Sequence, residues 1–231
     1  MVLSLPHMST FGEPELVLKQ IVVGPLMENV YILGDKGTGE CLVIDPGAEG
    51  ERILQEVRRL GLEVTLVVNT HGHVDHIGAV ATVVEATRAS YGIHPGDRPL
   101  LEAAASSPLR VMLPDFREPP QPDLELAQGQ WVQVGSLRLR LLETPGHTPG
   151  SVCFYLEGQD GPGMVFTGDT LFRGSIGRYD LPGGDGRLLL QSIREKLLVL
   201  PPETRVYPGH GPGSTIGWEK AHNPFLLQDY G

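Results

Sequence analysis

A single seven-residue stretch, Thr70-His71-Gly72-His73-Val74-Asp75-His76, places three imidazoles and a carboxylate directly after the apolar run 64–68. A short apolar run that gives way to a polar turn is typical of a strand and its end. Imidazoles mixed with a carboxylate favour a borderline divalent metal such as zinc, iron or manganese over calcium or magnesium. The stretch therefore requires a fold in which a strand ends at a metal site.

Three more residues of metal-ligand type lie in turns rich in small residues. These turns are 144–150, 166–170 and 207–211, and each follows a strand-like run. Their glycines and prolines allow sharp turns and a close approach of the backbone. In layered α/β folds, ligands gather at the carboxyl ends of strands, so we expect the four turns to converge at one sheet edge. An isolated H-x-H pair would fit a polar turn equally well. The full set instead predicts a metal centre formed by His71, His73, Asp75, His76, His147, Asp169 and His210.

Strands and helices alternate along the chain. Short runs rich in β-branched residues predict strands over 16–23, 30–33, 41–44, 64–68, 131–134, 137–142, 152–156, 164–167 and 204–207. Apolar residues at helical spacing predict helices over 53–60, 77–90, 100–106 and 188–200. The proline-rich stretch 108–122 is interpreted as a surface insertion and a passive connector. This mixture predicts a layered α/β fold with a sheet-rich core and helices outside.

Composition restricts the classes of function. The 231 residues, 40% of them hydrophobic, can bury a sizeable core, and we expect one domain over 1–231. A net charge of −10 argues against a nucleic-acid partner, because binding phosphate backbones requires clustered Lys and Arg. The two cysteines, Cys41 and Cys153, lie in apolar runs and do not indicate a disulfide framework.

The chain shows no targeting or membrane signal. Residues 1–10 lack the basic and apolar regions of a signal peptide, and no stretch approaches the roughly 18 apolar residues of a membrane span. We therefore expect a cytoplasmic protein without a membrane partner.

Across nearly the whole chain, the H-x-H-x-D-H run, the three later ligand residues and Val43-Ile44-Asp45-Pro46-Gly47 resemble the metallo-β-lactamase superfamily. The resemblance implies a four-layer αβ/βα sandwich of two mixed β-sheets flanked by helices. It also implies two divalent metal ions, expected to be zinc with iron or manganese as alternatives. One ion would be held by His71, His73 and His147, the other by Asp75, His76 and His210, and Asp169 would bridge them.

Within the superfamily, residues 171–178 and 207–212 resemble the short, bacterial-type glyoxalase II (hydroxyacylglutathione hydrolase) proteins. This resemblance implies a hydrolase acting on a small-molecule thioester of the S-(2-hydroxyacyl)glutathione type. The residues allow this chemistry, because bound metal lowers the pKa of water to about 7 and a thiolate leaves without a strong acid. The catalytic group would be His71, His73, Asp75 and Asp169, with Asp75 orienting the attacking hydroxide and Asp169 bridging the metals.

Four polar residues beside the ligands are candidates for orienting them: Asp45, Thr70, Thr148 and Thr170. Turn capping is the alternative role for each one alone. His94 and His222 lie outside the ligand turns and are interpreted as ordinary hydrogen-bonded or surface histidines.

Substrate recognition departs from the family pattern. Longer glyoxalase II proteins bind glutathione partly through a C-terminal helical domain. This chain ends about twenty residues after His210, so we expect no such domain. Arg178 falls where the family carries a basic glutathione-binding residue, and Tyr179 is a candidate for lining the pocket. Asp180, however, stands where an aromatic hydroxyl is expected. A salt bridge to Asp180 or Asp185 is the alternative role of Arg178.

Three other functions stay open at this stage. The motifs also resemble persulfide dioxygenases, which use one iron bound here by His71, His147 and Asp169. A lactonase or β-lactamase could use the same two-metal site, although lactamases of one major class carry a cysteine in place of Asp169. A non-catalytic binding module would be expected to have lost ligands, and all seven are present. The sequence leaves the oligomeric state open.

Overall fold

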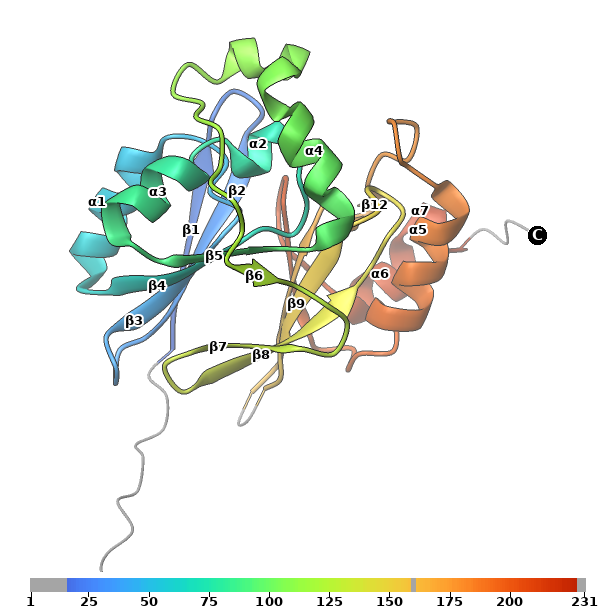
Figure 1. Ribbon diagram of the computed structural model, residues 1–231. Coiled ribbons are helices and arrows are strands. Elements are labelled where there is room, and N and C mark those ends of the chain that lie inside the picture. Colours follow the sequence, from blue (N-terminus) through green and yellow to red (C-terminus); the bar gives the residue numbers. More distant parts are fainter. Residues whose placement is uncertain (1–15, 159–160, 228–231) are drawn as a thin grey trace, which may run out of the picture.

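The computed structural model describes residues 16–158 and 161–227, and two six-stranded sheets packed face to face form its centre. Figure 1 shows the sheets side by side, with α1 (Gly50–Leu60) and α3 (Val80–Thr87) outside one sheet and α5 (Gly186–Ser192) and α6 (Ile216–His222) outside the other. Helix, sheet, sheet and helix make four layers. The α/β sandwich expected from the sequence is confirmed.

The first sheet is mixed and has the order β1-β2-β3-β4-β5-β6. An antiparallel meander of β1 (Leu16–Val23), β2 (Glu28–Asp35) and β3 (Glu40–Ile44) leads into three parallel pairings with β4 (Glu63–Val68), β5 (Ser90–Ile93) and β6 (Leu124–Glu125). Parallel neighbours end at the same edge of a sheet. The turn after β4 therefore lies beside the turn after β3.

The second sheet has the order β14-β13-β10-β9-β8-β7. Its strands are β7 (Trp131–Val134), β8 (Leu137–Glu143), β9 (Val152–Leu156), β10 (Met164–Gly168), β13 (Arg205–Pro208) and β14 (Ser214–Thr215). Only the β10–β13 pair is parallel. A small hairpin of β11 (Leu171–Phe172) and β12 (Ser175–Ile176) follows β10.

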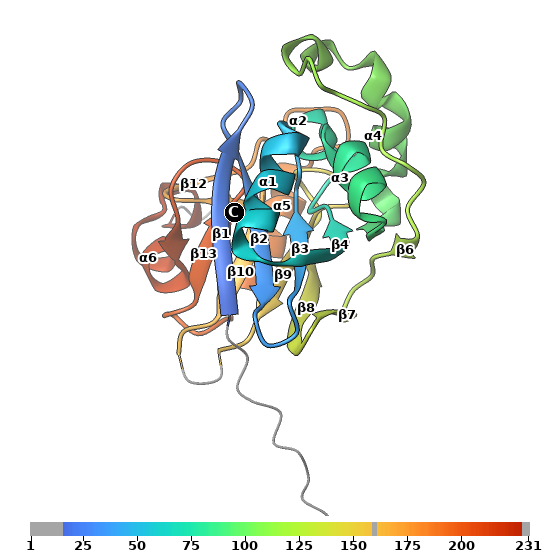
Figure 2. The ribbon, with the colours of Figure 1, turned by 90° about the vertical axis from the view of Figure 1, so that its left-hand side faces the viewer.

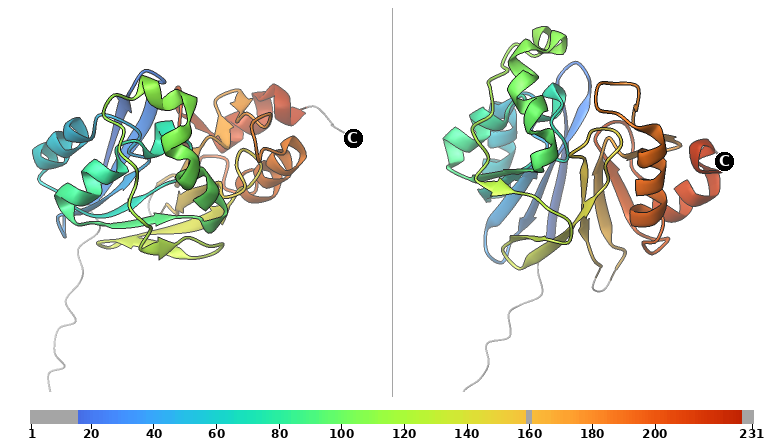
Figure 3. Two further views of the ribbon diagram at one scale, coloured as in Figure 1. Left: turned by 45° about the horizontal axis from the view of Figure 1, so that its top comes forward. Right: turned by 45° about the vertical axis from the view of Figure 1, so that its right-hand side comes forward.

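Three apolar clusters join the layers. The central one lies between the sheets and includes the fully buried Leu33, Leu42, Phe154 and Phe166. The two outer clusters pack helices onto sheets, α1 and α3 on one side and α5 with α6 on the other, and Figures 2 and 3 show each helix pair from its own side. Burial of apolar surface contributes about 25 cal/mol per Å², so these interfaces supply most of the stability.

Most predicted elements are present within a few residues of their expected bounds. The predicted helix over 77–90 is wrong as a single element, because the chain forms α2 (Val74–Ile77), then α3, and then strand β5. The backbone N–H of Ala79 donates to the carbonyl oxygen of Pro46 at 2.9 Å, so a distant segment interrupts the helical hydrogen bonding between α2 and α3. Arg88 ends α3 in the left-handed region, with φ at 60°.

Other expected helices are shorter or irregular. The predicted helix over 188–200 is α5 followed by a π-helical turn, η4 (Ile193–Leu197). The stretch around 100–106 is α4 (Arg98–Ala103) and η2 (Ala104–Ser106), after the short turn η1 (Pro95–Asp97). The stretch 108–122 is mostly exposed, as predicted, but begins with η3 (Pro108–Met112) and buries Leu113 against the first sheet's helices. The sequence did not predict α6, α7 (Pro224–Leu227) or the strands β5, β6 and β14.

Two expectations from composition can be compared with the structure. Cys41 and Cys153 are both buried free thiols. Among the described residues, no helix has the length and apolar character needed to cross a membrane. Residues 1–10, whose composition argued against a signal peptide, lie outside the described residues.

Candidate metal centre

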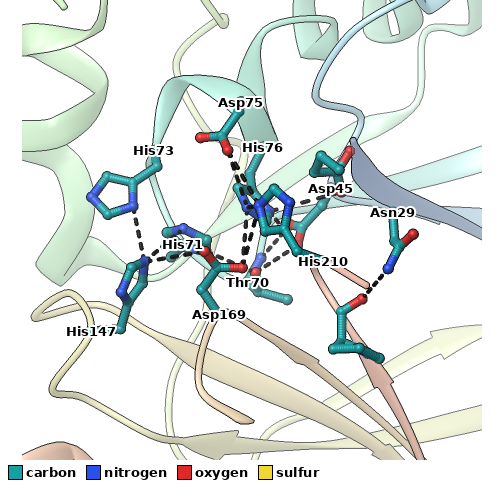
Figure 4. A network of polar contacts seen from close by, with 12 residues as sticks. Asn29, Asp45, Thr70, His71, His73, Asp75, His76, His147, Asp169 and His210 are labelled. Carbon is teal, nitrogen blue, oxygen red and sulfur yellow. Dashed lines mark hydrogen bonds and ion pairs between the residues drawn. The ribbon is translucent and has the colours of Figure 1, made fainter. Parts of the chain in front are cut away.

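The four turns predicted to carry ligands meet at one edge of the sandwich. His71 and its neighbours follow β4, His147 follows β8, Asp169 follows β10 and His210 follows β13. Figure 4 shows the seven side chains converging from these separate segments. Two sheets thus contribute to one site, as the strand-end argument predicted.

Three imidazoles form the first ligand group. Nε2 of His147 lies 3.0 Å from Nδ1 of His73 and 3.3 Å from Nε2 of His71. Ligands around a tetrahedral zinc with Zn–N bonds of 2.0–2.1 Å stand about 3.4 Å apart. The spacing of these three nitrogens therefore suits one small divalent ion.

The second ligand group combines one carboxylate with two imidazoles. Nε2 of His210 lies 3.3 Å from Nε2 of His76 and 3.3 Å from Oδ2 of Asp75. All three residues can point one ligand atom at a common centre. Nε2 of His76 lies 3.9 Å from Oδ2 of Asp75, so this group is slightly more open than the first, whose two distances are 3.0 and 3.3 Å.

Asp169 stands between the two groups and turns one oxygen to each. Its Oδ1 lies 3.4 Å from Nε2 of His76 and 3.7 Å from Nε2 of His210, while Oδ2 lies 3.6 Å from Nε2 of His147. Oδ1 is buried and has no hydrogen-bond partner among the described residues. A buried carboxylate oxygen without a partner is costly, and a bound cation would compensate for it. The donor set and this unpartnered oxygen therefore fit two divalent ions.

Burial and mutual charge shift the pKa values of the ligands. Burial lowers the pKa of His71 well below its usual range, and burial with the charge of neighbouring imidazoles lowers that of His73 to about 4. Burial would also lower the pKa of His76, but the carboxylates of Asp169 and Asp75 outweigh it and raise that pKa. Burial would raise the pKa of Asp75, yet the imidazoles beside it lower that pKa below its usual range. His71 and His73 thus favour neutral imidazole, the form that binds metal.

Backbone carbonyls fix the orientation of two ligand rings. Nδ1 of His147 donates to the carbonyl oxygen of Arg178 at 2.7 Å, and Nδ1 of His210 donates to that of Leu26 at 3.0 Å. A proton held on Nδ1 leaves the lone pair of Nε2 free for a metal. Arg178 therefore contributes to the site through its main chain.

Asp45, which follows β3, supports the loop that carries His71, His73 and His76, as expected from its position in the chain. Its carboxylate accepts hydrogen bonds from the backbone N–H and hydroxyl of Thr70, from Asn69 and from Nδ1 of His76. The hydroxyl of Thr70 also lies 3.1 Å from Nδ1 of His71. Asp45 and Thr70 thus touch ligand residues directly, which is more than turn capping.

The other two threonines have different surroundings. Thr148 reaches the ligand loops through a residue that the sequence did not single out, because its hydroxyl donates to Asp97 at 2.8 Å. The hydroxyl of Thr170 bonds that of Thr144 at 3.0 Å, and its described hydrogen bonds reach none of the ligands. Turn packing is the role that the structure gives Thr170.

Asp97 is a site residue that sequence reasoning missed. It is fully buried, and its carboxylate accepts hydrogen bonds from the backbone of Gly72 and of Gly150 at 2.8 and 2.7 Å, besides that of Thr148. It therefore joins the His71–His73 loop to the His147 loop. The surrounding His-Pro-Gly-Asp turn offered no signal of this role, since its contacts lie 25 to 53 residues away along the chain.

Glu28 and Asn29 were also missed. The amide of Asn29 donates to the carbonyl oxygens of Pro208 and Gly211, which brackets His210. Glu28 is buried with both carboxylate oxygens unpartnered among the described residues, and Oε1 lies 3.9 Å from Nδ1 of His76. Burial raises the pKa of Glu28 well above its usual range.

The two candidate substrate residues lie outside the cluster of ligands. The Arg178 guanidinium is exposed and makes a bidentate pair with Asp180 at 3.0 and 2.9 Å, the alternative role named above. Tyr179 is 47% exposed and lines a cavity of about 510 Å³ beside α5. Contact of either side chain with a substrate stays a prediction.

The chain was compared with known families and proteins. The family model described as the metallo-beta-lactamase superfamily matches residues 23–210. A Haemophilus influenzae protein named hydroxyacylglutathione hydrolase GloC is 38% identical over 208 residues, covering 89% of this chain and 96% of that protein. The mouse mitochondrial persulfide dioxygenase ETHE1 is 32% identical, covering 96% of this chain and 80% of that protein.

Solved structures share the fold. The BLEG-1 B3 metallo-beta-lactamase superimposes with a TM-score of 0.83 at 38% identity, covering 92% of this chain and all of that one. A protein solved in a di-iron-bound form superimposes with a TM-score of 0.80 at 43% identity, covering 90% and 100% of the two chains. Relatives with different named activities thus share one architecture.

Proposed function

The chain belongs to the metallo-β-lactamase superfamily, and from this premise we propose that it hydrolyses small-molecule thioesters with two divalent metal ions. One observation carries the proposal: two compact groups of three ligands lie side by side, and the two oxygens of Asp169 face one group each. A single-metal site would not need the second group. We expect zinc in both positions, with iron or manganese as alternatives.

The seven side chains fit two ions, with His71, His73 and His147 holding one, Asp75, His76 and His210 holding the other, and Asp169 shared. Metal ions bound there would lower the pKa of water to about 7 and stabilise negative charge on a carbonyl oxygen. Hydrolysis adds the oxygen of water to the acyl carbon, breaks the carbon–sulfur bond and releases the thiol.

Protein groups would orient the attacking water and hold its proton. Asp75 is 13% exposed, so its carboxylate reaches the open side of the centre and can accept a hydrogen bond from the attacking water. The imidazoles are fixed from behind by Asp45 and by the Arg178 carbonyl oxygen, so little reorganisation is needed during the reaction. A thiolate is a good leaving group, so no dedicated acid is required.

The likeness to the Haemophilus protein supports S-(2-hydroxyacyl)glutathione as the type of substrate. Arg178 is our candidate for a substrate carboxylate. Its pair with Asp180 is exposed, and solvent screens exposed ion pairs, so a substrate could displace Asp180.

Metal analysis combined with two assays tests the proposal. The purified protein should contain about two divalent ions per chain and should hydrolyse S-lactoylglutathione, with activity lost on chelation and restored by zinc, iron or manganese. The control is the Asp169→Ala variant, which should hydrolyse no thioester at any metal concentration.

The same experiment separates the hydrolase from a persulfide dioxygenase. His71, His147 and Asp169 alone could hold one iron with open positions for oxygen. One iron per chain, together with oxygen uptake on glutathione persulfide and no thioester hydrolysis, would refute the two-metal hydrolase.

A further inference from the structure

A second feature near the metal centre is a cavity of about 380 Å³ at the outer edge of the second sheet. It lies where β13 and β14 meet α6 and the β11–β12 turn. Arg173, Arg205, Tyr207 and Trp218 line it together with the hydroxyl-bearing Ser214 and Thr215. We call this space the arginine cavity.

Among residues 16–158 and 161–227, no carboxylate forms an ion pair with the two guanidinium groups of the arginine cavity. None of its described lining residues carries a carboxylate. Neither Arg173 nor Arg205 makes an ion pair within the described part of the chain, whereas Arg52 and Arg117 on other surfaces pair with Glu49 and Glu85. Two uncompensated guanidinium groups in one cavity are unusual in a chain of net charge −10, and they indicate a site for an anion.

Glu219, the nearest acidic side chain of α6, does not neutralise the cavity. It is fully buried, and its carboxylate accepts hydrogen bonds from the backbone of Gly174, the hydroxyl of Ser214 and the amide of Asn223. These bonds fix the turn that carries Arg173 against α6. Glu219 therefore supports the wall of the cavity and is not one of its lining residues.

Trp218 holds Arg173 in place. The guanidinium carbon lies 5.1 Å from the centre of the indole ring, and His222 stacks on the same indole at 5.0 Å. A guanidinium packed on an aromatic ring keeps the N–H groups at its edge available. Such a preorganised fork suits the bidentate binding of a phosphate.

The chain segments that carry Arg173 and Tyr207 also approach the candidate ligand His210. Phe172, the neighbour of Arg173, has its ring 6.3 Å from the ring of the ligand His210, and Tyr207 precedes His210 by three residues. Arg205 lies two residues further from His210 along β13. A ligand could therefore have one end at the metal centre and an anionic group between the two arginines.

We propose that the arginine cavity binds a phosphate group on the thiol part of a substrate, so that thioesters of phosphorylated thiols form a second substrate class of the same centre, beside the glutathione type. The inference rests on the proposed thioester hydrolysis. Two guanidinium groups match the charge of a phosphate monoester, about −1.5 to −2 at pH 7, whereas a carboxylate would neutralise only one. The carbon–sulfur bond still breaks at the metal centre, and the arginines bind without taking part in the chemical step.

The test compares three acetyl thioesters on the metal-loaded protein, those of coenzyme A, glutathione and N-acetylcysteamine. The coenzyme A thioester carries phosphates, the glutathione thioester carries carboxylates but no phosphate, and the N-acetylcysteamine thioester carries no charge. Arg173→Gln and Arg205→Gln should each lower kcat/KM for the coenzyme A thioester about tenfold relative to the N-acetylcysteamine thioester. The change should lie in KM, and added salt should diminish the preference. Arg117→Gln removes the same charge elsewhere and should leave the ratio unaltered.

Each of the other possible outcomes contradicts one part of the proposal. If the ratio is unchanged while the uncharged thioester is hydrolysed, the phosphate site is refuted and the hydrolase stands. If both variants weaken the glutathione and coenzyme A thioesters equally, the cavity binds anions in general and the preference for phosphate is wrong. If no thioester is hydrolysed, the proposed function fails. Calorimetry with coenzyme A and with inorganic phosphate then tests the cavity alone, and binding that both variants leave unchanged refutes it.

Discussion

At the residue scale, the site depends on side chains that hold the ligands as much as on the ligands. Asp97, Asp45 and Asn29 each fix a ligand loop through buried hydrogen bonds. Such supporting partners commonly change metal affinity by 10- to 100-fold when they are removed. The candidate ligands and Asp45 were recognisable from the sequence, whereas Asp97 and Asn29 were not.

Removing the Asp97 carboxylate should weaken metal binding and folding together. Asp97→Ala leaves two backbone N–H groups and the Thr148 hydroxyl without their acceptor, at about 1–3 kcal/mol for each group that stays unpaired. We expect a lower Tm and about a 10- to 100-fold weaker metal affinity, measured by thermal unfolding and equilibrium dialysis. Asp123→Ala is the control, since Asp123 accepts from the backbone of Tyr91 away from the ligands, and it should lower only Tm. Unchanged metal affinity in Asp97→Ala would contradict this role.

The two ligand groups should be separable by mutation. His147→Ala damages only the first group and His210→Ala only the second, so each variant should retain about one metal ion per chain. Asp169→Ala removes an oxygen from both and should reduce both occupancies, because its two oxygens face different groups. Metal content measured at fixed free metal concentration distinguishes these patterns. Equal metal loss in all three variants would show that the groups do not bind independently.

At the element scale, strand ends and close turns bring the ligands together. The turn after β13 runs past the turn after β10, and the backbone N–H of Gly209 donates to the carbonyl oxygen of Gly168 at 2.8 Å. A Cβ at Gly209 would lie 2.5 Å from Oδ1 of Asp169 and 2.7 Å from Cε1 of His76. Glycine is required here by proximity to the ligands.

Gly209→Ala should therefore disable the second ligand group. Shifting Asp169 and His76 by about 1 Å is enough to lower activity about 100-fold, since misplacement of this size commonly costs that much. Thioester hydrolysis and metal content should both fall. Gly161→Ala is the matched control, because a Cβ there meets no atom within 4 Å. Full activity in Gly209→Ala would mean that the turn can move without harm.

At the scale of the whole molecule, the metal centre joins the two sheets. The first sheet supplies the residues from His71 to His76, and the second supplies His147, Asp169 and His210. Since these ligands repel or remain unpaired without a cation, bound metal should stabilise the sandwich as well as support catalysis.

Chelation should therefore lower the thermal stability of the protein. An ion present at a thousand times its Kd contributes about 4 kcal/mol, which for a chain of 231 residues corresponds to a Tm shift on the order of 10 °C. Differential scanning calorimetry with and without a chelator measures the shift, and zinc should restore the original Tm. Identical transitions in both conditions would show that the sheets are held without metal.

The sequence by itself determined the layered α/β fold and predicted the seven candidate ligand residues, because both depend on local information: apolar periodicity, residue type and glycine- or proline-marked turns. Tertiary structure decided the rest. The expected helix over 77–90 was interrupted where the backbone N–H of Ala79 bonds the carbonyl oxygen of Pro46, a contact between distant segments. Asp97 and Asn29 gained their roles from partners 25 to 182 residues away. The arginine cavity likewise exists only because folding brings Arg173 and Arg205 together, and no local pattern encodes such distances.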